Sequence, residues 1–502
     1  MGPATTGGLT DARHQDVWMG VDLGTQSVRA LAVTDDGRVL GRGSAPLTGH
    51  RDGDRHEQHP SDWWEGTVTA LSRALRGIPA TRVRGVAVCS TSGTVLLADP
   101  AGEPLTPALM YDDGRAGEQA RRAQEAGDEV WRALGHRIQP TWALAKLLWL
   151  AGNPADGRPP WWPGARVCHQ ADFVTTRLVG RPVPTDTSHA LKTGYDLATG
   201  AWPGAVHDRL GLSGLDFPAV VAPGSPLGTV CGAAADRTGL AEGTPVVAGM
   251  TDGCAAQLGS GAWEVGQWNT VLGTTLVLKG VTATPLHDPA GVLYNHLSPD
   301  GDWLPGGASS VGAGALTLAF PGADLGHLDR LAAHREPAGA VSYPLVSRGE
   351  RFPFLAAEAE AFTLGRPADD ADRYAALLQG VALVERLALS YVRQLGAPVD
   401  GPLTFTGGAT RSGYWNQLRA DILGRNARVP AHTDSALGMA VLAARGVRGE
   451  TPPRGMVRIR TVLEHRPRVG ARFAEPFATL VDALEQRGWL PPETAAHARE
   501  HG

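Results

Sequence analysis

The stretch 21–27 reads Val-Asp-Leu-Gly-Thr-Gln-Ser. A strand-like run, residues 17–21, leads into it and a second, residues 28–34, leaves it, which predicts a hairpin turn between two strands. Such a turn exposes backbone N–H groups that can hold an anion, and the carboxylate of Asp22 can hold a hydrated divalent cation. Ordinary hairpin turns also use glycine and threonine, so this stretch alone leaves both interpretations open.

A matching stretch occurs about half a chain later. Residues 271–278 read Val-Leu-Gly-Thr-Thr-Leu-Val-Leu, so Leu23-Gly24-Thr25 and Leu272-Gly273-Thr274 lie in the same setting between apolar runs. The repetition predicts two related halves, each presenting a hairpin turn to a shared cleft. Two anion-holding turns that face each other would suit a polyphosphate.

Composition narrows the class of function. A formal net charge of -5 argues against a basic nucleic-acid binder, and no apolar run approaches the roughly 18 residues that cross a bilayer. The four cysteines lack metal-ligand spacing, which favours a reducing, cytoplasmic setting. None of the three lysines, Lys146, Lys192 and Lys279, follows a glycine, so the chain has no P-loop.

Strand and helix signals alternate along the chain and predict an α/β fold. The length suggests about three average domains or two large ones. A Pro- and Gly-rich passage, residues 221–243, predicts a seam, which divides the chain into a loose tail (1–16), a first lobe (17–243) and a second lobe (244–502). Predicted elements include strands 84–89, 245–249 and 403–406, and helices 62–75 (opened by a capping box at Asp62), 141–150, 372–395 and 413–423.

Asp252 is the main candidate for chemistry. It follows a buried strand signal and opens a helix among small residues, which is where ligands bind in α/β folds. There it can take the proton from an attacking hydroxyl. Aspartate is equally a good helix N-cap, so a purely structural role stays open.

Three further clusters have both a functional and a structural interpretation. Gly407-Gly408-Ala409 ends a strand without bulky side chains, so an adenine or ribose can lie against its backbone, or the glycines can simply form a tight turn. The hydroxyl residues of 90–94 can bind a sugar or form a Ser/Thr-rich loop. Asp112 and Arg115 can contact a substrate or form an ion pair.

Five motifs, in order along residues 16–450, together resemble the FGGY family of carbohydrate kinases. Asp22-Leu23-Gly24-Thr25-Gln26-Ser27 and Leu272-Gly273-Thr274-Thr275 resemble its two phosphate motifs, and Gly249-Met250-Thr251-Asp252-Gly253 resembles its catalytic aspartate motif. Residues 379–391 are similar to its C-terminal signature helix. Gly407-Gly408-Ala409, with Asn416 downstream, resembles its adenosine motif.

The resemblance implies two actin-like (ribonuclease-H-like) lobes with ATP and a sugar in the cleft between them. The first lobe would bind sugar and phosphate, and the second would carry the catalytic aspartate and bind ATP. The family transfers the γ-phosphate of ATP to a sugar hydroxyl with Mg²⁺, largely through positioning and charge neutralisation. Asp252 would be the general base and Asp22 would organise the metal or the sugar. The resemblance assigns sugar contacts to Asp22, Ser92, Thr94, Asp112 and Asp252, and ATP contacts to Gly24, Thr25, Gln26, Ser27, Gly273, Thr274, Thr275, Gly407, Gly408, Ala409 and Asn416.

The same resemblance indicates a substrate. Thr91-Ser92-Gly93-Thr94 and residues 111–115 resemble the bacterial and plant D-ribulose kinases once grouped with xylulokinases. The Gln-Met-His-Gly loop of xylulokinases and the Arg-Glu pair of glycerol kinases are both missing at this place. We therefore expect conversion of D-ribulose to D-ribulose 5-phosphate, with D-xylulose or another pentulose or polyol as the alternative.

Two other classes compete with this prediction: a non-catalytic sugar sensor on the same fold, and an actin-like filament or chaperone ATPase. The expected partners are a small sugar and ATP, without nucleic acid or membrane, in a monomer or homodimer.

Overall fold

The computed structural model describes residues 15–152, 159–449 and 454–502, and the chain divides into two compact units. The first unit comprises Met1–Gly259, His296–Gly301 and Asp434–Arg458, and the second comprises Ser260–Asn295, Asp302–Thr433 and Ile459–Gly502. Most of the predicted tail lies outside the described residues. Its last two residues are held to the first unit, because Arg82 donates to the Gln15 carbonyl and Arg84 pairs with Asp16.

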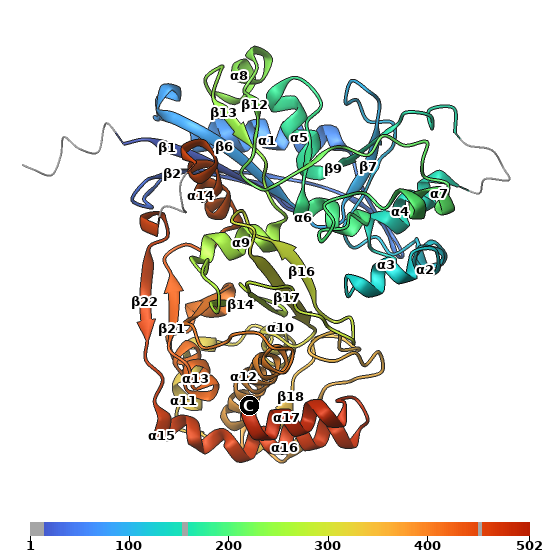
Figure 1. The fold of residues 1–502 in the computed structure, drawn as a ribbon. Coiled ribbons are helices and arrows are strands. Elements are labelled where there is room, and N and C mark those ends of the chain that lie inside the picture. The colour runs from blue at the N-terminus through green and yellow to red at the C-terminus, as the bar shows by residue number, and fades with distance from the viewer. Residues whose placement is uncertain (1–14, 153–158, 450–453) are drawn as a thin grey trace, which may run out of the picture. The chain divides into compact units, whose positions relative to one another are not determined.

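The first unit is built on a six-stranded sheet in the order β12-β13-β6-β1-β2-β3 (Figure 1). Its three central strands are parallel: β1 (Val17–Leu23), β6 (Val83–Ser90) and β13 (Pro245–Val247). The antiparallel strands are β2 (Ser27–Thr34), β3 (Val39–Pro46) and β12 (Pro226–Thr229). The predicted hairpin turn therefore joins β1 to β2.

Alternation of side chains along β1 decides which residues face which layer of helices. Val17, Met19, Val21 and Leu23 pack in one apolar cluster with residues of α1 (Pro60–Ala74) and α5 (Gln170–Val179). Gly20 faces the other way, and a Cβ there would lie 1.8 Å from the carbonyl oxygen of Ala436 in α14 (Ser435–Arg448). Asp22, two residues on, points to the same side as Gly20.

A second, five-stranded sheet in this unit supports the loops with the predicted sugar contacts. Its order is β4-β5-β8-β7-β9, formed by β4 (His50–Asp52), β5 (Arg55–Gln58), β8 (Ala108–Leu109), β7 (Val95–Ala98) and β9 (Arg166–His169). The unit also contains a strand pair, β10 (Thr185–Asp186) with β11 (Val220–Val221), and the helices α2 (Gly117–Ala126), α3 (Asp128–Ala133), α4 (Ala143–Ala151), α6 (Thr187–Ala190), α7 (Gly204–Leu210), α8 (Gly232–Thr238) and α9 (Asp252–Ser260).

The second unit is built on a seven-stranded sheet in the order β16-β17-β15-β14-β20-β21-β22. Its parallel strands are β14 (Trp268–Leu272), β20 (Leu403–Thr406) and β21 (Ala427–Pro430). The antiparallel strands are β15 (Leu276–Gly280), β17 (Trp303–Ser309) and β22 (Ile459–Leu463), and β16 (Tyr294–Leu297) lies at the edge.

The two sheets share one plan. Read from one edge, β3-β2-β1-β6-β13-β12 matches β17-β15-β14-β20-β21-β22 in order and in the direction of every neighbouring pair. The turn at Gly24 corresponds to the turn at Gly273, each joining the first parallel strand to its hairpin partner. The predicted α/β fold with two related halves is confirmed at the level of topology.

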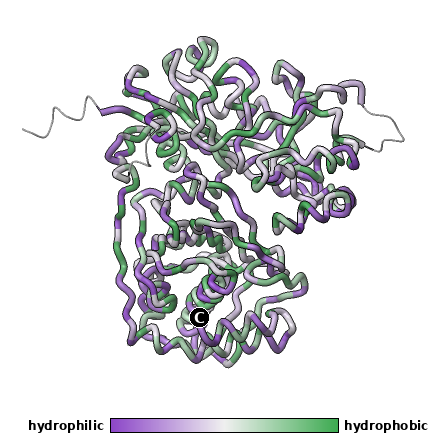
Figure 2. Tube along the Cα trace, in the orientation of Figure 1, coloured by the Kyte–Doolittle hydropathy of each residue, from purple (hydrophilic) through white to green (hydrophobic). Residues whose placement is uncertain are grey.

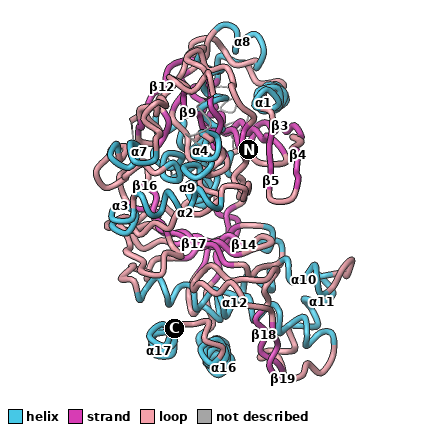
Figure 3. The backbone as a smooth tube through the Cα atoms, turned by 90° about the vertical axis from the view of Figure 1, so that its right-hand side faces the viewer, coloured by secondary structure: helices cyan, strands magenta, loops and turns pink. Residues whose placement is uncertain are grey.

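The long helix α12 (Asp370–Gln394) is buried in the core of the second unit and lies below β14 in the view of Figure 3. Its Ala388 and Val392 pack with Trp268 and Phe405 of the sheet. By length and composition alone this helix could cross a membrane, but nearly all of that window is buried inside the unit, as in the core helix of a globular unit. The remaining helices are α10 (Gly314–Ala319), α11 (Leu325–Ala332), α13 (Gly413–Leu423), α15 (Pro467–Gly470), α16 (Ala474–Gln486) and α17 (Pro492–His501), and β18 (Ala340–Tyr343) pairs with β19 (Phe362–Gly365).

The C-terminal segment carries no sequence motif, yet it completes the core of the second unit. Polar and apolar residues mix along α16 and α17 (Figure 2). Phe477, Leu480, Leu484 and Ala495 from these helices join the apolar cluster that surrounds α12. The segment therefore has a packing role.

Two boundaries differ from the sequence prediction. The predicted seam at 243 falls inside the first unit, because Val246 and Val247 of β13 pair with β6. Asp252 therefore belongs with Asp22 in the first unit. Helix α1 begins at Pro60 rather than at a capping box on Asp62, because proline is well suited to the first helical position.

Candidate functional site

The carboxyl ends of the parallel strands bring Asp252, the predicted general base, and Asp22, the predicted metal or sugar ligand, to one edge of the first sheet. Asp22 is paired with Cys89 and Leu23 with Ser90, while Ser90 forms a parallel bridge with Thr251. Asp252 follows at once as the first residue of α9. This edge is where ligands bind in α/β sheets, so the geometry agrees with the placement predicted from sequence.

Asp22 is buried in an acidic setting. The Cys89 thiol donates to its Oδ1 at 3.6 Å, and the N-cap residue of α14, Asp434, lies near enough to repel it. Burial, followed by the charge of Asp252, raises the pKa of Asp22 to about 6, while Arg29 opposes the shift. A cation at this place would relieve the repulsion between the carboxylates.

The first hairpin turn is held through its carbonyl groups. Gln58 donates to the carbonyl oxygen of Thr25 at 2.7 Å, and the backbone N–H of Leu47 donates to that of Gln26 at 2.8 Å. No described residue accepts a hydrogen bond from the backbone N–H of Thr25 or Gln26. The turn therefore presents donors that an anion can use.

The second hairpin turn is fixed from behind by the residues that lead into α10. The N–H of Ala313 donates to the carbonyl of Gly273 at 2.9 Å, and that of Gly314 to the carbonyl of Thr274 at 3.0 Å. Within the described part of the chain, the N–H groups of Thr274 and Thr275 have no backbone acceptor. The two turns thus resemble each other in chemistry as well as in topology.

The predicted adenosine motif follows β20. Gly407 has φ 87°, and a Cβ there would lie 2.4 Å from the carbonyl oxygen of Leu272, so only glycine fits beside the second turn. Gly408 has open space where a Cβ would be, whereas the side chain of Ala409 is buried in the core. Asn416 donates to the carbonyl oxygen of Thr410 at 3.0 Å, so it braces this loop from inside.

The predicted sugar residues of the loop 90–94 differ in accessibility. The hydroxyl of Ser92 is buried and forms no hydrogen bond with a described residue, so its hydrogen-bonding capacity is unused within the described part of the chain. Thr94 is wholly buried, and its hydroxyl lies 2.6 Å from that of Thr91, which also bonds to Gln170. Thr94 therefore supports the loop from within.

The two acidic residues at 112 and 113 have separate partners. Asp112 contacts Arg51 at 2.5 Å and Nδ1 of His56 at 2.6 Å. Although burial alone would raise the pKa of Asp112, the hydrogen bonds from His56 and Arg51 lower it overall. Arg115 pairs instead with Asp113 and Glu57, both at 2.7 Å, so Arg115 has the structural role and Asp112 stays the candidate for a sugar contact.

A buried chain of hydrogen-bonded polar groups lies next to the carboxyl ends of the parallel strands of the first sheet. It was not predicted from the sequence. Nε2 of His189 lies 2.8 Å from Oγ of Ser90, and its Nδ1 lies 2.5 Å from Oδ2 of Asp186. Burial alone would lower the pKa of His189, but the Asp186 carboxylate raises it overall. Ser188 accepts a hydrogen bond from the N–H of Thr251 at 2.8 Å, so the chain supports both strand ends that carry the site. Its members come from three segments without a shared motif.

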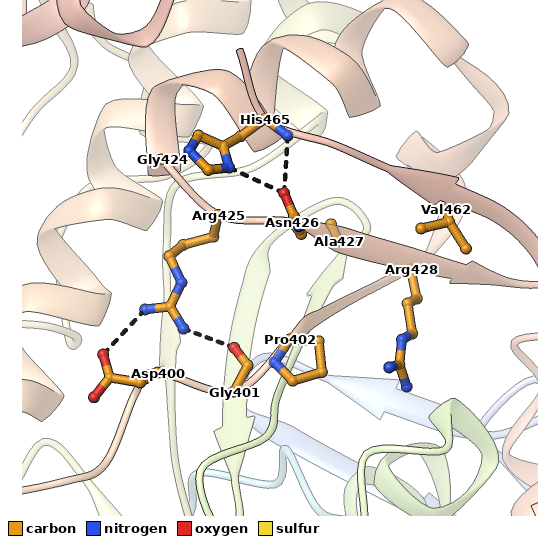
Figure 4. Close-up of a pocket in the computed structure, with 10 residues that line it drawn as sticks. All are labelled: Asp400, Gly401, Pro402, Gly424, Arg425, Asn426, Ala427, Arg428, Val462 and His465. Atoms are coloured by element: carbon orange, nitrogen blue, oxygen red, sulfur yellow. Dashed lines mark hydrogen bonds and ion pairs between the residues drawn. The ribbon is translucent and has the colours of Figure 1, made fainter. Parts of the chain in front are cut away.

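The second unit also has a surface groove of about 430 Å³, lined by the segments that lead into β20 and β21 and by the end of β22. Arg425 donates to the carbonyl of Gly401 at 2.7 Å, and His465 contacts Asn426 at 3.0 Å (Figure 4). Gly401 and Pro402 precede β20, whereas the adenosine motif follows it. The groove lies at the amino ends of the parallel strands, so it is not where a nucleotide is expected.

The residues of the first unit fit a magnesium ion that arrives with a nucleotide. Among the described residues no group of three or more His, Cys, Asp or Glu side chains could hold a metal. Mg²⁺ usually keeps several waters and binds through one or two carboxylates plus phosphates. Asp22, buried beside the negative charges of Asp252 and Asp434, offers such a carboxylate.

Comparisons with known proteins agree with this geometry. The description "FGGY family of carbohydrate kinases, N-terminal domain" matches residues 17–259, and the C-terminal domain of the same family matches residues 268–447. The chain is 31% identical to a xylulose kinase of Streptomyces rubiginosus over 441 residues (86% of this chain, 89% of the relative). It is 32% identical to one of Streptomyces coelicolor over 443 residues (86% and 88%). A solved xylulose kinase structure from Rhodospirillum rubrum superposes with a TM-score of 0.82 at 25% identity, covering 94% of this chain and 99% of that one.

Proposed function

Because the chain belongs to the FGGY family of carbohydrate kinases, we propose that it transfers the γ-phosphate of ATP to a hydroxyl of a ketopentose, with Asp252 as the general base. The family fold, two mixed α/β lobes of actin-like type, is that of this chain, and the activity class is phosphotransfer from ATP to an alcohol group. The observation that carries the residue assignment is the meeting of Asp22, Ser90 and Asp252 at one sheet edge.

The proposed mechanism gives each of these groups a separate role. Asp252 accepts the proton of the attacking sugar hydroxyl, which makes the oxygen a better nucleophile. The free N–H groups at Thr25, Gln26, Thr274 and Thr275 bind phosphate oxygens, and the backbone at Gly407-Gly408 accommodates the adenosine. Asp22 holds the metal or a sugar hydroxyl, and Mg²⁺, when bound with the nucleotide, neutralises phosphate charge.

The substrate class rests on the relatives and on one loop. The two Streptomyces relatives, which are 31% and 32% identical to this chain, are xylulose kinases. D-xylulose is therefore the first candidate for the substrate. The loop Ser90-Thr91-Ser92-Gly93 lacks the Gln-Met-His-Gly sequence of xylulokinases and offers the buried Ser92 hydroxyl instead. That difference favours D-ribulose as the second candidate.

A panel of sugars tests this assignment. Coupled ADP-release assays with D-xylulose, D-ribulose, their L forms, glycerol and gluconate should show the highest kcat/KM for one ketopentose. A control without sugar measures background ATP hydrolysis. The ketopentose assignment fails if glycerol or gluconate gives the highest kcat/KM, or if ADP release is indifferent to added sugar.

The second turn gives a prediction specific to ATP. In Gly312→Ala the new Cβ would lie 2.3 Å from the carbonyl oxygen of Thr274 and 2.5 Å from Cα of Thr275, so the turn has to shift. We expect the KM for ATP to rise about tenfold or more, as for the loss of one or two backbone hydrogen bonds, with little change in the sugar KM.

Gly413→Ala is the matched control, because the new Cβ would meet no atom within 4 Å and the residue opens a helix in the same unit. Its KM for ATP should equal that of the wild type. Equal KM values for ATP in wild type and Gly312→Ala would remove the second turn from phosphate binding.

A further inference from the structure

Lys146 is a charged residue buried where the helix around it is apolar. It lies in α4, which reads Ala-Leu-Ala-Lys-Leu-Leu-Trp-Leu-Ala, and its side chain is 0% exposed. Lysine is almost never fully buried unless it has partners, because removing an ammonium from water is costly. The position therefore calls for an explanation in terms of its contacts.

The ammonium of Lys146 joins two loops that are distant in sequence. Its Nζ donates to the carbonyl oxygen of Gly93 at 3.2 Å and to that of Met110 at 2.5 Å. Gly93 belongs to the loop 90–94, which follows β6, and Met110 opens the loop 110–115, which follows β8. The structure thus ties both loops to one atom on α4.

A second group also holds each loop, so the loops 90–94 and 110–115 are each fixed at more than one point. Lys192 donates to the carbonyl oxygen of Ser92 at 3.4 Å. The guanidinium of Arg115 lies 4.7 Å from the ring centre of Trp149, also on α4, and pairs with Asp113. Helix α4 therefore acts as a common base for the two loops, with Lys146 as the only residue among these that bonds to both.

These two loops carry Ser92 and Asp112, two of the sugar contacts that the family resemblance assigns. We propose that Lys146 is a positioning residue of the sugar site, which fixes the spacing between the loop 90–94 and the loop 110–115 and thereby the fit of the sugar hydroxyls. This role rests on the proposed function only in that the two loops bind the sugar. It does not depend on which sugar is the substrate.

The charge of Lys146 gives the role a pH signature. Burial, only partly opposed by Asp113, lowers the pKa of Lys146 from 10.5 to about 7, and the other charges that face it are Lys192, Asp112 and Arg115. Hydrogen bonds from a charged donor are roughly twice as strong as neutral ones. The sugar KM should therefore rise as the pH increases above about 7.

The stability of the protein responds to pH in the opposite sense. The unfolded chain keeps the proton of Lys146 to a higher pH than the folded chain does. Lys146 therefore favours folding more as the pH rises from about 7 to 10.5.

The test compares wild type, Lys146→Met and Lys279→Met with whichever sugar the wild-type chain phosphorylates best. Lys146→Met should raise the sugar KM about 10- to 100-fold, with little change in the KM for ATP or in kcat at saturating sugar. It should also abolish the rise of the sugar KM above pH 7. Lys279 is a buried lysine of β15 and serves as the control with unchanged kinetics.

The wild-type pH profile is a second measurement that does not depend on the variant folding. A sugar KM that stays flat from pH 6 to 9 in the wild type would overturn the proposal, as would an unchanged sugar KM in a folded Lys146→Met. If the preferred sugar proves not to be a ketopentose, the ketopentose assignment falls, while the effect of Lys146 on the KM of that sugar still decides this proposal.

Discussion

Asp252→Asn is expected to lower kcat about 100- to 10,000-fold, the contribution typical of a general base. The amide keeps the size of the side chain but cannot accept the proton of the attacking hydroxyl. Because Asp252 opens α9 and asparagine is an equally good residue at a helix start, the fold should be preserved. The KM for ATP should change little, since the nucleotide is assigned to the hairpin turns and to the adenosine motif.

The measurement is steady-state kinetics with the preferred sugar, together with ATP binding by calorimetry. Asp236→Asn is the matched control, because Asp236 is an exposed residue of α8 in the same unit. A kcat for Asp252→Asn within about threefold of wild type would remove this residue from the proton transfer. Lost ATP binding would mean that the residue serves nucleotide binding and not the chemical step.

The sequence was informative where function depends on residues that are neighbours in the chain. The two turns are local patterns of glycine, hydroxyl residues and flanking apolar alternation, and both fold as predicted between β1 and β2 and between β14 and β15. The position of Asp252 at the start of a helix followed from the same kind of local signal. Local sequence signals likewise predicted β20 and α13 with their observed bounds.

What the sequence could not provide is which distant segments complete the site. Helix α14 lies more than 400 residues after β1, yet its start brings Asp434 close to Asp22. Helical periodicity shows that α14 has an apolar face but not which sheet covers it. The roles of Lys146 and of the Asp186–His189–Ser90 chain could not be predicted from the sequence for the same reason, because their partners come from separate loops. The seam was misplaced because Pro245–Val247 looks like the start of a new half when its pairing partner β6 is unknown.

Asp22→Asn is expected to lose most of the activity and to make the protein more stable. In the folded chain, burial and the nearby charge of Asp252 raise the pKa of Asp22 from 3.8 to about 6. The folded chain therefore holds this proton at a pH where the unfolded chain has released it, and stability falls as the pH rises from about 3.8 to about 6. At pH 7 the cost is of the order of 3 kcal/mol, and a neutral amide removes it.

Thermal unfolding in EDTA at pH 5 and pH 7.5 measures this effect. The apparent Tm of Asp22→Asn should exceed that of the wild type at pH 7.5, and the difference should shrink at pH 5. Asp36→Asn provides the control of opposite sign, because a hydrogen bond from Thr34 lowers the pKa of Asp36, so its removal should give no gain in stability. A destabilised Asp22→Asn at pH 7.5 would show that the carboxylate is not strained in the free protein. A gain in stability together with lost turnover would instead mean that the first unit keeps an unfavourable buried charge because catalysis requires it.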